Sequence, residues 1–137
     1  MKFTLQRVHF MPKELEPGIL YVSEEFGAVA HLCACGCGSK IRTPLGPTEW
    51  KLTETKDGPT LYPSVGNWQQ KCQSHYLITK GEIRWAAKWS GEEILAGRQR
   101  EQRHREKYYA ELDRQRKQKR SLWQRIKDFL GWFTLKK

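Results

Sequence analysis

The sequence predicts an α+β protein, in which a small β-rich domain stapled by zinc is followed by a strongly basic helical tail. Short β-branched and aromatic runs alternate with glycines and prolines as far as residue 90. Four cysteines fall into two clusters in this region. Beyond Ser90 the chain has no proline and is rich in the helix formers Arg, Gln, Glu and Lys. We therefore expect a zinc-binding β-rich domain at residues 1–90, a basic solvated helix at 91–120 and an amphipathic aromatic helix at 121–137.

Alternation of apolar and polar residues over 3–10 is typical of a strand with one buried face. The other strand candidates are the short runs at 19–22, 28–32, 41, 50–52, 60–62, 75–78 and 82–86. Turn and breaker residues are expected to interrupt them at Pro44, Pro47, Asp57-Gly58-Pro59 and Pro63. Gly81 predicts a tight turn, so that the last two runs should pair as a hairpin.

Three thiols alternate along Cys33-Ala34-Cys35-Gly36-Cys37-Gly38, and a fourth opens the segment Cys72-Gln73-Ser74-His75. Thiolate and imidazole are the ligands of closed, tetrahedral structural zinc sites. The glycines at 36 and 38 let the backbone fold tightly enough for neighbouring sulfurs to converge. The pattern predicts a Zn2+ site formed by Cys33, Cys35, Cys37 and Cys72.

Five soft donors are available for four positions, which leaves the fourth ligand open. If Cys72 completes the site, His75 stands beside the metal and is free to act as a base. If His75 is the fourth ligand, one cysteine is spare and the site is structural. A site with three protein ligands and a bound water would be hydrolytic, which the surplus of donors disfavours. Buried free cysteines are the remaining alternative, and the clustering argues against it.

The positive charge is concentrated in the tail. Residues 1–90 carry 11 Lys and Arg against 8 Asp and Glu, whereas residues 91–137 carry 14 against 7. The N-terminal residues form no apolar signal-peptide core, and no apolar run reaches membrane-spanning length. We therefore expect a cytoplasmic protein, in which clustered thiols bind metal more readily than they form disulfides.

Residues 98–120 have few apolar positions and offer ion pairs at helical spacing, which is typical of a spacer helix or of an arm that contacts nucleic acid. Ser121 is the expected cap of a last helix. The apolar face of that helix carries Leu122, Trp123, Ile126, Phe129, Leu130 and Phe133. It is too short to span a bilayer.

Three occupants of this apolar face remain open. Flanking cations suit peripheral attachment to an anionic membrane surface, and they are Arg120, Arg125, Lys127, Lys136 and Lys137. Docking on a protein partner would bury the face equally well. The third alternative is packing on the domain or on a second copy of the chain.

Several segments together resemble a family of small bacterial domains found with ubiquitin-like conjugation components. They are Cys33-Ala34-Cys35-Gly36-Cys37-Gly38, Trp50, residues 58–66, Cys72-Gln73-Ser74-His75 and Gly81-Glu82-Ile83-Arg84-Trp85. The resemblance covers residues 1–88 and leaves out the basic tail. It implies a ubiquitin-like protein or its conjugation machinery as the partner, and a processing or deconjugating peptidase as the activity. Ala34 departs from the pattern, because related sequences often carry proline there.

Beside that resemblance, Ser64 becomes the candidate nucleophile and His75 the candidate base. Ser74 is nearer to His75 in sequence, but adjacent residues of a strand point to opposite faces. The carboxylates available to orient the imidazole are Glu49, Glu54 and Asp57. The structural alternative is that Ser64 caps a turn and His75 binds zinc.

Three classes of function follow. The first is a serine-type peptidase that uses Ser64 and His75 on the end of a ubiquitin-like protein. The second is a non-catalytic zinc adaptor that binds a protein of the same pathway and docks through its tail. The third is a zinc protein whose basic helix contacts the phosphates of nucleic acid. It is disfavoured, because the domain is only weakly basic and no base-reading helix follows the metal ligands.

Overall fold

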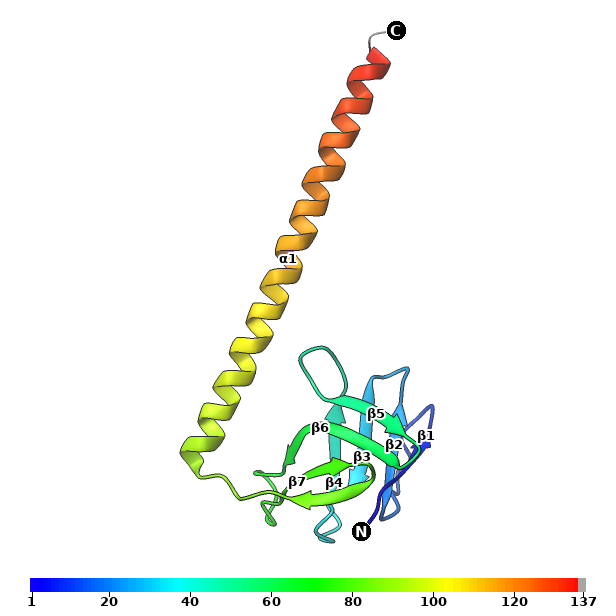
Figure 1. The fold of residues 1–137 in the computed structure, drawn as a ribbon, viewed down its shortest axis with the longest axis vertical. Coiled ribbons are helices and arrows are strands. Elements are labelled where there is room, and N and C mark those ends of the chain that lie inside the picture. Colours follow the sequence, from blue (N-terminus) through cyan, green and yellow to red (C-terminus); the bar gives the residue numbers. More distant parts are fainter. Residues whose placement is uncertain (136–137) are drawn as a thin grey trace. The chain divides into compact units, whose positions relative to one another are not determined.

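Two four-stranded sheets and a C-terminal helix make up residues 1–135, the part of the chain that the computed structural model describes (Figure 1). The first sheet contains β1 (Thr4–Arg7), β2 (Ile19–Ser23), β3 (Ala28–Leu32) and β4 (Lys40–Pro44) in this order. The second contains β5 (Lys51–Thr55), β6 (Gly58–Gly66), β7 (His75–Thr79) and β8 (Glu82–Trp85). The helix α1 spans Gly91–Leu135. The α+β class expected from the sequence is thus confirmed.

Neighbouring strands pair antiparallel throughout the second sheet, and the first sheet differs only in its parallel β1–β2 pair. The hairpin expected around Gly81 is present, since β7 pairs with β8 from Tyr76 opposite Trp85 to Thr79 opposite Glu82. Gly81 has a φ of 81°, and a Cβ there would lie 2.7 Å from the carbonyl oxygen of Phe3. Only glycine fits this turn without moving the N-terminal segment.

The break expected at Asp57-Gly58-Pro59 is present as the turn between β5, which ends at Thr55, and β6, which begins at Gly58. The break expected at Pro63 is wrong, because β6 runs through this residue. Its register against β7 shifts between Leu61 and Val65, which marks an irregularity of the kind in which proline is tolerated. Four steps along β6, from Leu61 to Val65, face two steps along β7, so a residue of β6 in this stretch can lack a paired N–H, as proline does. The same irregularity contains Ser64, and bulges commonly re-aim a side chain.

The two sheets bury a common apolar core. Its members come from both sheets and are Phe3, Leu20, Val22, Val29, Cys33, Ala34, Ile41, Leu61, Val65, Tyr76 and Ile78. On the second sheet the alternate positions Leu61, Val65, Tyr76 and Ile78 are almost completely buried. The residues between them on β6 and β7 therefore face away from the core.

The helix α1 begins with a capping box. The Glu93 backbone N–H donates to Ser90 Oγ at 3.2 Å, and the Ser90 backbone N–H donates to a Glu93 carboxylate oxygen at 2.6 Å. The cap expected at Ser121 is wrong, because α1 continues through this residue to Leu135. Lys136 and Lys137, which belong to the segment expected at 121–137, lie outside the described residues.

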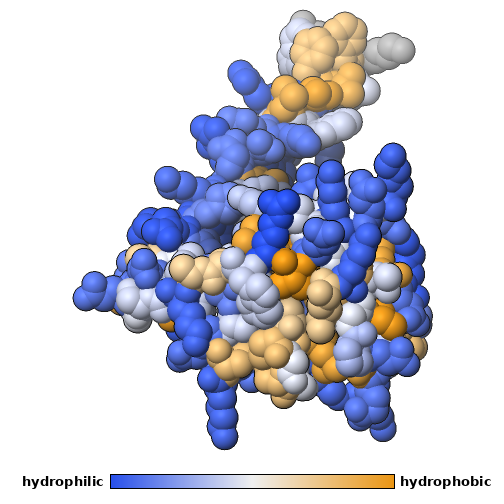
Figure 2. Space-filling view, turned by 60° about the horizontal axis from the view of Figure 1, so that its bottom comes forward, coloured by the Kyte–Doolittle hydropathy of each residue, from blue (hydrophilic) through white to orange (hydrophobic). Residues whose placement is uncertain are grey.

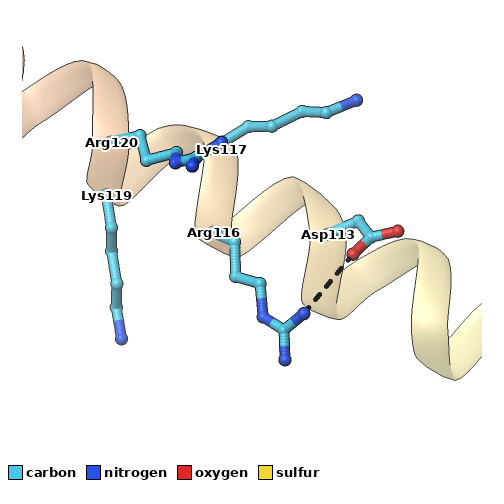
Figure 3. A pocket seen from close by; sticks show the side chains of 5 residues that line it. All are labelled: Asp113, Arg116, Lys117, Lys119 and Arg120. Atoms are coloured by element: carbon cyan, nitrogen blue, oxygen red, sulfur yellow. Dashed lines mark ion pairs between the residues drawn. The ribbon is translucent and has the colours of Figure 1, made fainter.

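Side chains along α1 change character from its middle to its C-terminal end. The middle carries long charged side chains, among them Lys117 and Arg120 (Figure 3). Apolar side chains gather at the C-terminal end (Figure 2). Among the described residues, no helix has the length and apolar character of a membrane-spanning segment. By its contacts the chain divides into two units, Met1–Ile94 and the part that begins at Leu95.

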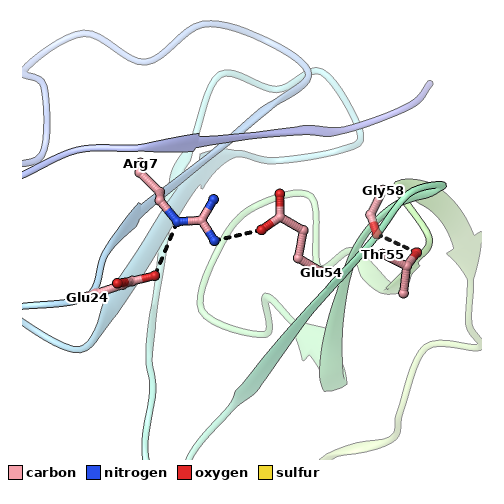
Figure 4. Close-up of polar contacts among 5 residues, drawn as sticks. All are labelled: Arg7, Glu24, Glu54, Thr55 and Gly58. Carbon is pink, nitrogen blue, oxygen red and sulfur yellow. Dashed lines mark hydrogen bonds and ion pairs between the residues drawn. The ribbon is translucent and has the colours of Figure 1, made fainter.

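A backbone hydrogen bond and a surface ion-pair network connect the two sheets of the first unit. The Phe3 backbone N–H donates to the carbonyl oxygen of Gly81 at 2.6 Å, which holds the N-terminal segment against the β7–β8 turn. On the surface, the Arg7 guanidinium lies 3.2 Å from a Glu24 carboxylate oxygen and 2.6 Å from one of Glu54 (Figure 4). Glu54 belongs to β5, so Arg7 of β1 links one sheet to the other.

Candidate active site and metal centre

The first three cysteines lie in a tight loop between β3 and β4. Cys33 follows the last residue of β3, and its backbone N–H donates to the carbonyl oxygen of Ser39 at 2.8 Å, which closes the loop. Gly36 and Gly38 have φ values of 84° and 80°, in the left-handed region that favours glycine. The glycines thus permit the tight folding expected of them, and the loop brings its three thiols together.

Cys72 completes a cluster of four sulfurs. The ligand atoms of Cys33, Cys35, Cys37 and Cys72 all lie within 4.8 Å of one another. The Cys33 sulfur is 3.4 Å from that of Cys35 and 3.9 Å from that of Cys72, and the Cys37 and Cys72 sulfurs are 3.7 Å apart. A tetrahedron with metal–sulfur bonds of about 2.3 Å has edges of about 3.8 Å. The cluster can therefore hold a metal ion, and its geometry is consistent with the expected zinc staple.

Ser74 and Asn67 contact the Cys33 sulfur through polar side-chain atoms. Ser74 Oγ lies 3.0 Å from the Cys33 sulfur and accepts a hydrogen bond from Asn67 Nδ2 at 2.8 Å. Asn67 Nδ2 also donates to the Cys33 sulfur at 3.6 Å. The Ser74 hydroxyl lowers the pKa of Cys72, and the Ser39 hydroxyl and backbone lower the pKa of Cys37 to about 6. Both shifts favour the thiolate form that metals bind, whereas burial and the neighbouring Cys33 thiol raise the pKa of Cys35 to about 12.

His75 and Ser64 meet on the outer face of the second sheet. Gly66 of β6 pairs with His75 of β7, and Ser64 stands two residues before Gly66. The Ser64 Oγ lies 2.8 Å from His75 Nε2. Ser64 is half-buried, and His75 is 7% exposed. The pair is within the hydrogen-bond distance that a nucleophile and its base require.

The second nitrogen of His75 fixes the tautomer of the ring. His75 Nδ1 lies 2.7 Å from the carbonyl oxygen of Ala87. A carbonyl oxygen only accepts, so Nδ1 must carry the hydrogen and donate it. In a neutral imidazole Nε2 is then the acceptor, and the Ser64 hydroxyl donates to it. This is the arrangement in which a serine proton can pass to the histidine.

Two tryptophans enclose the imidazole. The Trp68 ring centre lies 4.9 Å from that of His75, and the Trp89 ring centre lies 5.3 Å from it. The two indoles stack on each other at 5.6 Å. Gly66 makes room for this arrangement, because a Cβ there would lie 2.6 Å from Trp68 Nε1. The aromatic rings remove water from the base and restrict its rotation.

The structure distinguishes between the two roles that the sequence left open for His75, namely metal ligand and base. Both ring nitrogens contact other groups, and His75 is outside the set of converging ligand atoms. Ser74 faces the sulfurs, whereas its neighbour His75 faces Ser64. The geometry thus favours Cys33, Cys35, Cys37 and Cys72 over the set that includes His75.

A backbone oxygen takes the place expected for a carboxylate. The partner of His75 Nδ1 is the Ala87 carbonyl oxygen, and Glu54, one of the carboxylates expected there, pairs with Arg7. Sequence reasoning also missed Trp68, Trp89 and Asn67. The tryptophan signal was present, since aromatic residues lie on both sides of the histidine segment.

A protein-family model matches residues 7–86, which is more than half of the chain. The family model that matches there is described as BubE, bacterial ubiquitination-like system serine protease. The matched range contains all four cysteines, Ser64 and His75. The match confirms the resemblance drawn from the sequence motifs. No curated protein and no solved structure matches the chain.

Proposed function

The chain belongs to the BubE family of bacterial ubiquitination-like system serine proteases, and from this premise we propose that it cleaves the peptide or isopeptide bond at the C-terminal end of a ubiquitin-like protein. Ser64 is the nucleophile and His75 is the base. The observation that carries the proposal is the 2.8 Å contact between Ser64 Oγ and His75 Nε2, which is the acceptor in a neutral imidazole because Nδ1 donates to Ala87. The family description supports the serine protease class, and the proposed peptidase acts within a bacterial ubiquitination-like system.

The proposed reaction follows the chemistry of a serine–histidine pair. Ser64 Oγ attacks the carbonyl carbon of the scissile bond while its proton passes to His75 Nε2. The imidazolium is held by its Nδ1–H hydrogen bond to the Ala87 carbonyl. His75 then returns the proton to the leaving amine as the C–N bond breaks, which leaves an acyl ester on Ser64. A water molecule, deprotonated by His75, hydrolyses the ester and regenerates the serine.

We assign the cysteine cluster to structural zinc. Four protein ligands complete a tetrahedron and leave no position for a water molecule, so a zinc ion there supplies stability and no hydrolytic chemistry. The ion would tie the β3–β4 loop to the segment that leads into β7. It would thereby fix the strand that carries His75.

Covalent labelling tests the nucleophile without knowledge of the substrate. A fluorophosphonate probe should label the wild-type chain once, and peptide mass spectrometry should find the adduct on Ser64. Ser64→Ala should remove the label, whereas the matched control Ser121→Ala on exposed α1 should retain it. Ser74→Ala should retain the label as well, since Ser74 faces the sulfurs.

Cleavage provides the second test. With a ubiquitin-like protein of the pathway that carries a C-terminal extension, Ser64→Ala should lower kcat/KM by roughly 10⁴-fold. His75→Gln should lower it by roughly 10² to 10⁴-fold. Both variants should keep the circular dichroism spectrum and the metal content of the wild type. Absence of labelling and of cleavage in a folded, metal-loaded wild type would refute the peptidase and favour a non-catalytic adaptor for the pathway.

A further inference from the structure

The last turns of α1 present an apolar face that the proposed peptidase chemistry does not use. The face consists of Leu122, Trp123, Ile126, Phe129, Leu130 and Phe133. Their exposed fractions range from 39% for Ile126 to 63% for Trp123 and Phe133. At 100° per residue these side chains fall within an arc of about 120°. So much exposed apolar area on one arc is characteristic of a binding surface.

Basic side chains border this face on both sides. By the same helical geometry Arg125 lies beside one edge, and Arg120 and Lys127 lie beside the other. Residues 114–128 carry seven Lys and Arg against one Asp. Within the described chain Lys117, Lys119 and Arg120 form no ion pair, whereas Arg116 pairs with Asp113 (Figure 3). Figure 2 shows the apolar end of α1 next to hydrophilic side chains.

We propose that residues 119–133 bind the surface of an anionic membrane. The apolar face enters the boundary between headgroups and acyl chains, and the stems of Arg120, Arg125 and Lys127 bring their charges to the lipid phosphates. Trp123 lies at the edge of the apolar face next to Lys127. This position suits it, because indole rings prefer the membrane–water interface. The helix does not cross the bilayer, since its apolar stretch is too short.

Charge favours this occupant over a second copy of the chain and over nucleic acid. A second copy of the chain would bring the same basic edges against each other, which costs free energy through like-charge repulsion. Nucleic acid would pair with the charges but would leave the apolar face in water. An anionic lipid surface satisfies the cations and the apolar face together. This inference is independent of the peptidase proposal, because it uses none of its residues.

Vesicle sedimentation with the full chain tests the proposal. The wild type should bind phosphatidylcholine vesicles that contain phosphatidylglycerol, bind pure phosphatidylcholine vesicles far less, and dissociate as salt rises. Replacement of Arg120, Arg125 and Lys127 by Gln should weaken binding roughly 100-fold, because each cation near an anionic surface contributes about a factor of five. The matched control replaces Arg98, Arg100 and Arg103 by Gln and should weaken binding only slightly.

A second variant tests the apolar contribution. Phe129→Gln combined with Phe133→Gln should weaken binding by roughly tenfold or more while the net charge stays constant. Circular dichroism should show the helix retained in all variants. The proposal is overturned if the wild type ignores anionic vesicles, or if both α1 charge sets weaken binding equally. Dimerisation through the apolar face, or binding to duplex DNA, in place of vesicle binding would overturn it too.

Discussion

The cysteine cluster and the Ser64–His75 pair lie on opposite faces of one short segment, and they are supported in different ways. The cluster is supported by a glycine-rich loop and by the hydroxyl of Ser74. The pair depends on a cross-strand contact, a backbone carbonyl and two indoles. Adjacent residues, Ser74 and His75, therefore serve the two regions separately. The difference teaches that substitutions at two adjacent residues, Ser74 and His75, can act on different regions of the molecule.

Removal of the metal should have the largest effect and should break both regions together. A structural zinc contributes about 10 to 16 kcal/mol to folding in small domains, which matches or exceeds the total stability of about 5 to 15 kcal/mol of a typical protein. Excess chelator, or Cys72→Ser, should therefore abolish the cooperative thermal unfolding transition. Metal analysis should find one zinc per folded chain. A chelated chain that still melts cooperatively near the wild-type temperature would contradict this.

Ser74→Ala should separate the regions by weakening only the cluster. The substitution removes the 3.0 Å contact to the Cys33 sulfur and leaves Asn67 Nδ2 with that sulfur, 3.6 Å away, as its remaining acceptor. Loss of such a supporting group typically lowers metal affinity by about 10 to 100-fold. Competition with a chromophoric chelator measures this affinity, with Ser121→Ala as control. At saturating zinc, kcat/KM should stay close to that of the wild type, and a large fall would show that the two faces are coupled.

Trp68→Ala should affect the other region, and by less. Without the indole 4.9 Å away, the His75 ring gains rotational freedom and water. Loss of the fixed orientation of His75 should lower kcat by about tenfold, because a correctly oriented base lowers the activation barrier. KM and zinc affinity should change little, and Trp68→Phe should restore most of kcat. Gly66→Ala should act in the same direction, since its Cβ displaces the Trp68 indole. An unchanged kcat in both variants would exclude a positioning role.

Much of the first unit was predictable from the sequence, because alternation and β-branched runs specify strands locally. The convergence of the four thiols was predictable too, since three thiols at spacing two and a fourth in a CxSH segment have few other uses. The contact between Ser64 and His75 was a hypothesis from the motif, and its geometry could not be read from spacing. That geometry depends on the irregular pairing of β6 and β7, which is a tertiary feature.

The errors have local physical reasons. A cap at Ser121 would have ended one helix and nucleated another, and nucleation is costly, whereas serine inside a helix costs only about 0.5 kcal/mol. The break expected at Pro63 did not occur, because the strand absorbs the proline in an irregular stretch. The partner of His75 Nδ1 was missed because a backbone carbonyl belongs to every residue type and leaves no mark in the sequence.

That backbone carbonyl has a genetic consequence. Every amino acid that a codon change can place at position 87 supplies the same oxygen, so no point mutation there deletes the acceptor. The geometry can be lost only by moving the connector, which the hydrogen bond from the Ala86 N–H to the His75 carbonyl oxygen pins at 2.9 Å. Insertions or deletions between β8 and α1 are thus expected to displace this acceptor, which a search for an acidic third residue would not detect.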